Sequence, residues 1–155
     1  MTAEHVVDNQ GIIEVASDGA VVFDCNLANE PNGVIRLFGG ALAAKKITQK
    51  PNAILSGFGG ITGVLVIDTG AEVKLSGPTN IVGHVQIADG ATLEINDGNL
   101  LITGHTVCNG TIHIKGGRIV PQGGLSGDCN IISEPSDYNM EDLAFLAETW
   151  LWQNN

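Results

Sequence analysis

The chain has 155 residues, of which 43% are apolar, 5% are aromatic and 21 are glycine, and its formal net charge is −10. Its length suits one domain with a real core, filled by aliphatic rather than aromatic side chains. Seven Lys and Arg residues without a cluster argue against binding to nucleic-acid phosphates or to an anionic membrane surface.

The sequence shows neither the pattern of a membrane-spanning helix nor that of a signal peptide. Because no run of 18 apolar residues occurs, we expect no membrane span. Residues 1–5 lack the basic and apolar regions of a signal peptide, so we expect either a protein that is not exported or a mature form carrying Met1.

The amino-terminal third of the chain alternates apolar and polar residues between glycines. The alternating apolar pair Ile13/Val15 precedes Gly19, and the pair Ile35/Leu37 precedes Gly40. The two glycines are 21 residues apart. Such alternation is typical of strands with one buried face. Residues 41–60 fit this pattern less well. Residues 41–46 are compatible with a short helix or with another strand, before Pro51 and the glycines of 57–60 interrupt them.

The strongest periodicity lies in residues 61–118. The tetrapeptides ITGV, IVGH and ITGH begin at Ile61, Ile81 and Ile102, so they are 20 and 21 residues apart. Glycines recur at the same spacing, and each is followed by an alternating apolar pair; the glycines are Gly70, Gly90 and Gly110, and the pairs are Val73/Leu75, Leu93/Ile95 and Ile112/Ile114. Three columns at one period indicate an internal repeat.

Two architectures explain this repeat. Asp-Gly and Asn-Gly are hairpin signals, so an antiparallel meander is one alternative. A stack of coils explains the constant repeat length better, because each corner must lie over the corner below it. We therefore predict an all-β fold, a single-stranded parallel β-helix or β-solenoid over residues 1–133, with about five or six coils of about 20 residues.

Residues 134–155 form the second predicted segment, an amphipathic α-helix that caps the last coil or serves for attachment. Apolar residues at spacings of three and four predict one apolar stripe on this helix, formed by Leu143, Leu146, Ala147, Trp150 and Leu151. Both tryptophans of the chain, Trp150 and Trp152, lie here. An uncovered sheet edge at the end of a solenoid invites pairing with another chain, which is what a cap prevents.

Residues 137–152, DYNMEDLAFLAETWLW, resemble the closing helix of dockerin-like tails on secreted bacterial proteins. Those tails open with a calcium loop, of which only Asp137 and Asn139 remain, so calcium binding does not carry over. The resemblance implies an extracellular or cell-surface setting and a tail used for attachment. The repeat itself is similar in pattern to the parallel β-helices of pectate-lyase-like enzymes and bacterial adhesins.

Three cysteines, each followed by asparagine, occur at Cys25, Cys108 and Cys129. Cys108 and Cys129 are 21 residues apart, and adjacent coils bring Cα atoms to about 5 Å, which is within disulfide range. A disulfide between them and burial of Cys108 as a small apolar residue are both compatible with this spacing. Pairing of the two would leave Cys25 free for a bond to a neighbouring subunit.

The histidines and charged residues do not form a recognisable catalytic pattern. His84 and His105 follow equivalent glycines one coil apart, so we expect them to share a face, as a surface ladder rather than a metal or catalytic pair. His113 alternates with isoleucines and is expected to face solvent. Lys74, Lys115 and Arg118 lie on coils near some acids, but the carboxylates are scattered and no Asp column repeats at the coil spacing. The threonines do not form the regular ladder that ice binding requires. We therefore predict no catalytic residue, no cofactor and no metal site.

The functional hypothesis is a non-enzymatic structural protein, secreted or surface-exposed, that self-associates into oligomers or filaments through the solenoid ends. The predicted interface comprises Val6, Val7, Leu143, Leu146, Trp150, Leu151 and Trp152. A carbohydrate-binding or adhesive module that contacts a cell surface or a polysaccharide is the alternative. It needs exposed aromatic side chains on one face, and the solenoid has too few, with only Phe23, Phe38 and Phe58. A further alternative is a fragment of a polysaccharide lyase that uses Lys115 or Arg118.

Overall fold

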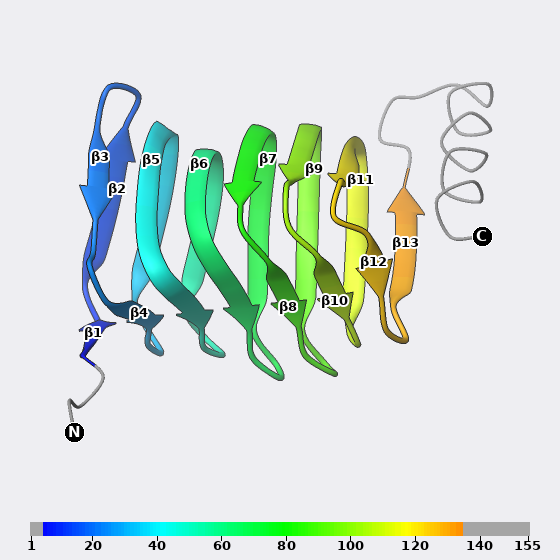
Figure 1. Ribbon diagram of the computed structural model, residues 1–155, viewed down its shortest axis with the longest axis horizontal. Helices are drawn as coiled ribbons and strands as arrows, with labels where there is room; N and C mark the ends of the chain where they lie inside the picture. The colour runs from blue at the N-terminus through cyan, green and yellow to red at the C-terminus, as the bar shows by residue number, and fades with distance from the viewer. Residues whose placement is uncertain (1–4, 135–155) are drawn as a thin grey trace.

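The computed structural model describes residues 5–134, which form a parallel β-solenoid of about six turns with coils of about 20 residues (Figure 1). This confirms the predicted solenoid and its period. Every pairing between strands in this part of the chain is parallel, which excludes the antiparallel meander. The predicted helix of 134–155 concerns residues 135–155, which lie outside the described residues, and Glu134 is the last residue of a strand.

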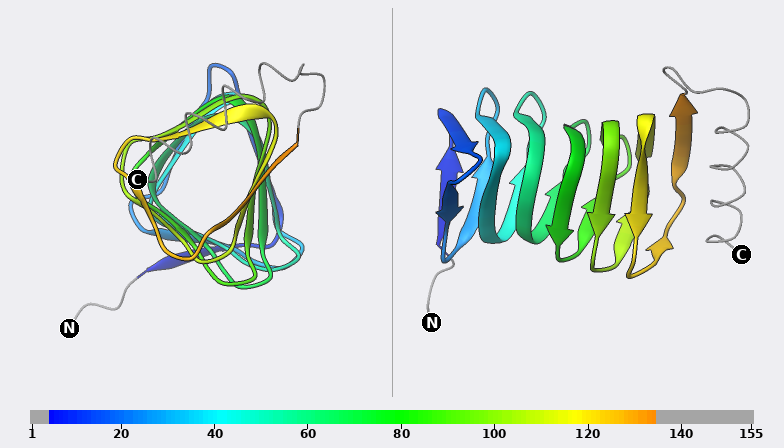
Figure 2. Two further views of the ribbon diagram at one scale, coloured as in Figure 1. Left: turned by 90° about the vertical axis from the view of Figure 1, so that its right-hand side faces the viewer. Right: turned by 90° about the horizontal axis from the view of Figure 1, so that it is seen from above.

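The described residues contain strands β1 to β13. The first six are β1 (Val6–Asn9), β2 (Ile12–Ala16), β3 (Ala20–Val22), β4 (Asn26–Asn29), β5 (Val34–Gln49) and β6 (Ile54–Ile67). The others are β7 (Glu72–Val82), β8 (Val85–Ile87), β9 (Thr92–Ile102), β10 (Thr106–Cys108), β11 (Thr111–Pro121), β12 (Leu125–Ser126) and β13 (Asn130–Glu134). Viewed along its axis, successive coils follow one closed outline (Figure 2).

The sequence columns coincide with the register of the sheet. Ile61 pairs with Ile81, and Ile81 pairs with Ile102, so the three similar tetrapeptides are stacked. The second column behaves in the same way, because Leu93 pairs with both Val73 and Ile112. These side chains are buried, and the alternation predicted from the sequence separates the interior from the surface.

Residues 41–60 form parallel-paired strands like the rest of the solenoid. Residues 41–46 belong to β5, so the strand alternative is correct and the short helix is not. The sequence period is obscured because the offset between partners shortens along this pair of strands, from Val34 and Ile54 at its start to Ile47 and Leu65 near its end. Two register shifts within the β5–β6 pairing absorb the difference.

Glycine is required where consecutive coils come together at a corner. Gly63 and Gly83 of the tetrapeptide column have φ angles of 125° and 147°, which side chains with a Cβ rarely adopt. A Cβ on Gly83 would collide with the carbonyl oxygen of Gly63, and one on Gly104 with that of Gly83. The repeated glycine therefore reflects close backbone approach at this corner.

One interior column changes chemistry along the axis. It runs from Asn9 through Asn29 and Gln49 in the first coils, and these polar side chains are buried. The column then continues through Ile67, Ile87 and Cys108. This interior column therefore consists of a ladder of buried side-chain amides in the first coils and of apolar side chains in the later coils.

The amides of this ladder bond along the axis of the solenoid. Asn9 Nδ2 donates to Asn29 Oδ1 at 2.9 Å, and Asn29 Nδ2 donates to Gln49 Oε1 at 2.9 Å. Gln49 Nε2 ends the chain by donating to the backbone carbonyls of Ala53 and Glu72, each at 3.0 Å. Hydrogen bonds of this kind satisfy polar groups whose burial would otherwise be costly.

Candidate functional site

The predicted assembly residues divide between described and undescribed parts of the chain. Val6 and Val7 lie on β1, at the amino-terminal edge of the sheet, and both are exposed. The remaining predicted interface residues, Leu143, Leu146, Trp150, Leu151 and Trp152, lie outside the described residues. Two of the seven predicted interface residues, Val6 and Val7, therefore lie at the amino-terminal end of the solenoid.

The cysteine pair lies at the opposite end of the described solenoid. The structure contains a disulfide between Cys108 and Cys129, whose Cα atoms are 5.0 Å apart. It joins the end of β10 to the segment just before β13, so it fastens the last described coil to the preceding one. Cys25 is unpaired and half-buried near the first coils.

His84 and His105 lie on consecutive coils, as expected. His84 Nδ1 accepts a hydrogen bond from the backbone N–H of His105 at 2.9 Å. The ring of His105 reaches the next coil, with Nδ1 3.0 Å from the carbonyl oxygen of Gly123 and Nε2 2.8 Å from Ser126 Oγ. The contact with the carbonyl requires a proton on Nδ1, and the hydroxyl of Ser126 can pair with Nε2 as donor or as acceptor. Both histidines thus join coils at a corner.

A cluster of charged side chains was not apparent from the sequence. On the outer surface, Lys74 and His113 are the two register neighbours of Glu94. Glu94 Oε1 lies 3.2 Å from Lys115 Nζ and 3.6 Å from His113 Nδ1, and Asn96 donates to Oε2 at 2.9 Å. The Glu94 side chain is only 7% exposed although it points outward, because these neighbours cover it.

His113 corrects the prediction that it faces solvent. Its side chain is 19% exposed and lies between Glu94 and Glu134, with Nε2 3.2 Å from Glu134 Oε1 but without hydrogen-bond alignment. Alternation placed it correctly outside the core, but the charged neighbours on adjacent coils enclose it. Their proximity follows from the register, in which His113 pairs with Glu94 and Lys115 pairs with Glu134. The pairing of Glu94 with His113 has the same offset as that of the apolar pairs Leu93/Ile95 and Ile112/Ile114 on either side of it.

The pKa of Glu94 reflects two opposing effects. Burial of the carboxyl group raises the pKa, but hydrogen bonds from Asn96 and Lys115 and the charges of Lys115 and Lys74 outweigh it. The pKa is therefore held below the ordinary value of 4.5, and Glu94 is ionised at neutral pH. The cluster is a structural ion-pair network on the last coils.

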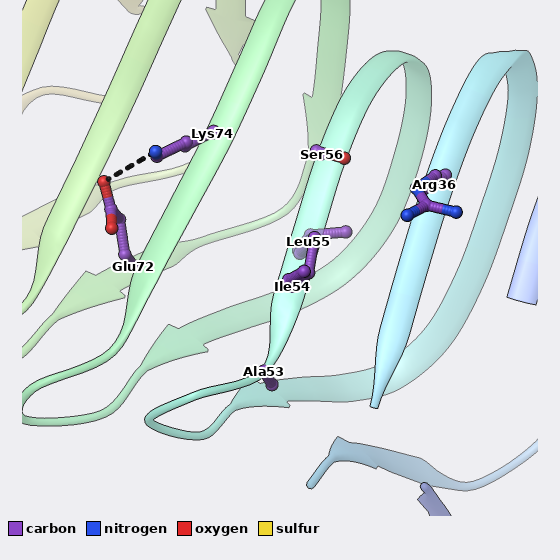
Figure 3. Close-up of a pocket in the computed structure, with 7 residues that line it drawn as sticks. All are labelled: Arg36, Ala53, Ile54, Leu55, Ser56, Glu72 and Lys74. Carbon is purple, nitrogen blue, oxygen red and sulfur yellow. Dashed lines mark ion pairs between the residues drawn. The ribbon is translucent and has the colours of Figure 1, made fainter. Parts of the chain in front are cut away.

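A second surface feature is a depression of about 380 Å³ over β5, β6 and β7 (Figure 3). Its lining comprises Arg36, Ala53, Ile54, Leu55, Ser56, Glu72 and Lys74. The hollow forms where a small residue interrupts a column of long ones, since Ser56 pairs with Arg36 on one side and Lys74 on the other. The uniform period did not reveal this column, because the offset from Ser56 to Lys74 is shorter than the offset from Arg36 to Ser56.

Two kinds of feature are absent from the described residues. Across residues 5–134, no three His, Cys, Asp or Glu side chains gather in a way that would hold a metal ion. No helix long and apolar enough to cross a membrane is present in the same range.

In comparisons with protein-family models, curated proteins and solved structures, nothing matches this chain.

Proposed function

We propose that this protein is a structural subunit that self-associates end to end through its amino-terminal coil. The observation that carries the proposal is the edge formed by β1, β2 and β3. In the described sheet, each of these strands is paired on one side only, β1 with β4 and the other two with β5. Unpaired backbone groups at such an edge favour strand addition.

The side chains at this edge support the proposal. Ile12 is 65% exposed and Val22 is 68% exposed, and Val6 and Val7 are exposed beside them. Interior residues of the same coil, Ile13, Val21 and Phe23, are only partly buried, whereas most core residues of the middle coils are buried completely. Another coil stacked on this edge would complete their burial.

A second copy of the chain is the partner that we infer. Coils of this chain already pack on one another through parallel pairing and aliphatic side chains, so a coil from another copy fits the same edge. The first coil carries Asp8, Glu14, Asp18 and Asp24 and has no Lys or Arg. All pairings between the described coils are parallel, and only a first coil stacked on the last coil of another copy continues that arrangement, so we propose a head-to-tail contact, which does not close and extends into a filament.

An extracellular or surface setting forms part of the proposal. The Cys108–Cys129 disulfide supports it, because structural disulfides persist mainly in oxidising compartments. The carboxy-terminal segment, with Leu143, Leu146, Trp150, Leu151 and Trp152, is proposed to take part in the contact at the tail end.

The experiment is light scattering after size exclusion, combined with negative-stain electron microscopy, over a range of protein concentrations. We expect rods that lengthen with concentration. Ile12→Lys and Val22→Lys should abolish them, because a charge at an exposed edge opposes strand addition without disturbing the core. Compact monomers of the unmodified chain at every concentration would refute the proposal.

Val82→Lys is the matched control. Val82 is 51% exposed but lies on β7 in the middle of the solenoid, so its substitution adds the same charge away from the edge. Rods should persist in this variant. If it blocks assembly as strongly as Val22→Lys does, the amino-terminal edge is not the interface. Trp150→Ala and Trp152→Ala then test the contribution of the tail, with shorter rods expected.

A further inference from the structure

The depression over Ser56 is independent of the proposed end-to-end contact, because it lies on the side of the solenoid. We propose that it binds the carboxylate of an acidic sugar in a carboxylated polysaccharide. Arg36 lies on the coil before that of Ser56, and Lys74 lies on the coil after it (Figure 3). Their backbones are two coil spacings apart, about 9–10 Å, so both long side chains reach a group lying over Ser56.

Both cations are available for a stronger partner than they now have. Arg36 is 3.9 Å from Glu14 and Lys74 is 3.6 Å from Glu72, and all four side chains are about half exposed. Ion pairs at such distances and exposure contribute little. A carboxylate in the hollow would receive charge-assisted hydrogen bonds from the guanidinium and the ammonium together, which are stronger than either present pair.

Glu72 distinguishes a sugar acid from a simple inorganic anion. It lines the same depression as Arg36 and Lys74 and would repel a bare phosphate or sulfate. A sugar carries hydroxyl groups beside its carboxylate, and these donate hydrogen bonds to Glu72. The lining therefore matches a ligand that offers one negative group and several donors within a few ångströms.

Two aromatic side chains extend the site along the same face. Phe38 and Phe58 pair in register on β5 and β6, two residues beyond Arg36 and Ser56, and both are exposed. Stacked exposed rings are a surface on which the apolar C–H faces of sugar rings pack. They place an apolar platform next to the charged hollow, as a polymer of acidic sugars requires.

The experiment is isothermal titration calorimetry at low protein concentration with two carboxylated probes, oligogalacturonate and oligomannuronate, and with the methyl ester of each. Binding of at least one acid, with loss of binding for its methyl ester, is expected. Arg36→Gln and Lys74→Gln should each weaken it about tenfold, the effect of losing one hydrogen bond to a charged group. Phe38→Ala should weaken it while leaving the salt dependence unchanged.

Lys45→Gln is the matched control, since it removes one positive charge from an exposed site on β5 beyond the bend at residues 39–40. Its affinity should equal that of the unmodified protein. Absence of binding to both acids, or equal binding to acid and ester, would overturn the proposal. An equal loss in Lys45→Gln would assign binding to net charge and overturn it as well. All substituted residues are exposed or half exposed, and unchanged thermal unfolding verifies folding.

Discussion

The side-chain amide of Asn29 donates a hydrogen bond to Oε1 of Gln49, 2.9 Å away on the next coil. Both residues are completely buried, and the same amide also donates to the carbonyl oxygen of Ile54 at 2.8 Å. Asn29 in turn accepts from Asn9. It is therefore the central member of a ladder that ties the first three coils together.

Asn29→Leu should lower the free energy of unfolding by about 2–3 kcal/mol, because it leaves the buried oxygen of Gln49 without its donor and the amide of Asn9 with the carbonyl of Val34 alone. Urea denaturation followed by circular dichroism measures this. The triple variant Asn9→Leu/Asn29→Leu/Gln49→Ile should cost less than the sum of the three single variants, since no unpaired side-chain amide remains. Strict additivity would contradict a coupled ladder.

Thr106→Val should stabilise the protein by about 1–2 kcal/mol, because valine has the same shape without an unsatisfied polar atom. Thr106 is completely buried, its hydroxyl has no hydrogen-bond partner, and its register neighbours are Val85 and Leu125. Thr79→Val is the control, because the buried hydroxyl of Thr79 donates to the carbonyl oxygen of Ser76 at 2.5 Å. That variant should be destabilised, and the two changes should differ in sign in the same urea assay.

Glu94→Gln should destabilise the protein by about 1–2 kcal/mol at neutral pH, since the hydrogen bond to Lys115 loses its charge. The folded-state pKa of Glu94 lies below 4.5, so its stabilising effect is present above that pH and is lost as the pH falls through the lowered pKa. The difference between the two proteins should therefore shrink as the pH falls below 4.5.

Glu14→Gln serves as the comparison for Glu94, because Glu14 is 53% exposed and lies 3.9 Å from Arg36. We expect a change of less than about 0.5 kcal/mol at any pH. If the two substitutions change the free energy of unfolding equally, burial of Glu94 by its neighbours does not strengthen its ion pairs.

Gly83→Ala should destabilise the solenoid by about 2 kcal/mol or more, because Gly83 has a φ angle of 147° and an added Cβ would meet the carbonyl oxygen of Gly63. Gly60→Ala is the matched control. Its Cβ would lie 3.7 Å from the Cβ of Ala41, which is an ordinary contact, and we expect a change within about 1 kcal/mol. Thermal unfolding of both variants measures the contrast.

Reduction of the Cys108–Cys129 disulfide should destabilise the last described coil. The bond closes a loop with a sequence separation of 21, for which chain entropy predicts about 3 kcal/mol. Backbone amides of β12 and β13 should exchange with solvent faster in dithiothreitol, whereas those of β7 should not change. Cys129→Ser should reproduce the reduced state, and Cys25→Ser should behave like the unmodified protein.

Much of the fold follows from the sequence alone. The glycine at each corner and the alternating aliphatic pairs of 61–118 predicted a stack of parallel coils, because identical local chemistry at a constant spacing requires identical positions in a stack. The equal spacing of Asn9, Asn29 and Gln49 is also visible in the sequence. This spacing alone does not predict a buried ladder, because polar residues on a strand are ordinarily expected to face solvent. Only the structure shows that these three side chains face the interior.

The candidate sites depend on the register between coils, which only the tertiary structure decides. The offset between paired residues varies within the solenoid, and it is shorter for Ile47 and Leu65 than for Ile81 and Ile102. A slip of one residue moves a side chain to the opposite face, so a uniform period cannot place Ser56 between Arg36 and Lys74. The alignment of Leu93/Ile95 with Ile112/Ile114 implies that Glu94 and His113 are neighbours, but only the structure shows how Lys115 and Asn96 cover Glu94. The sequence thus determined that the chain coils. The register between coils, which bulges alter in the pairings of β5 with β6 and of β6 with β7, determined which charged side chains meet on its surface.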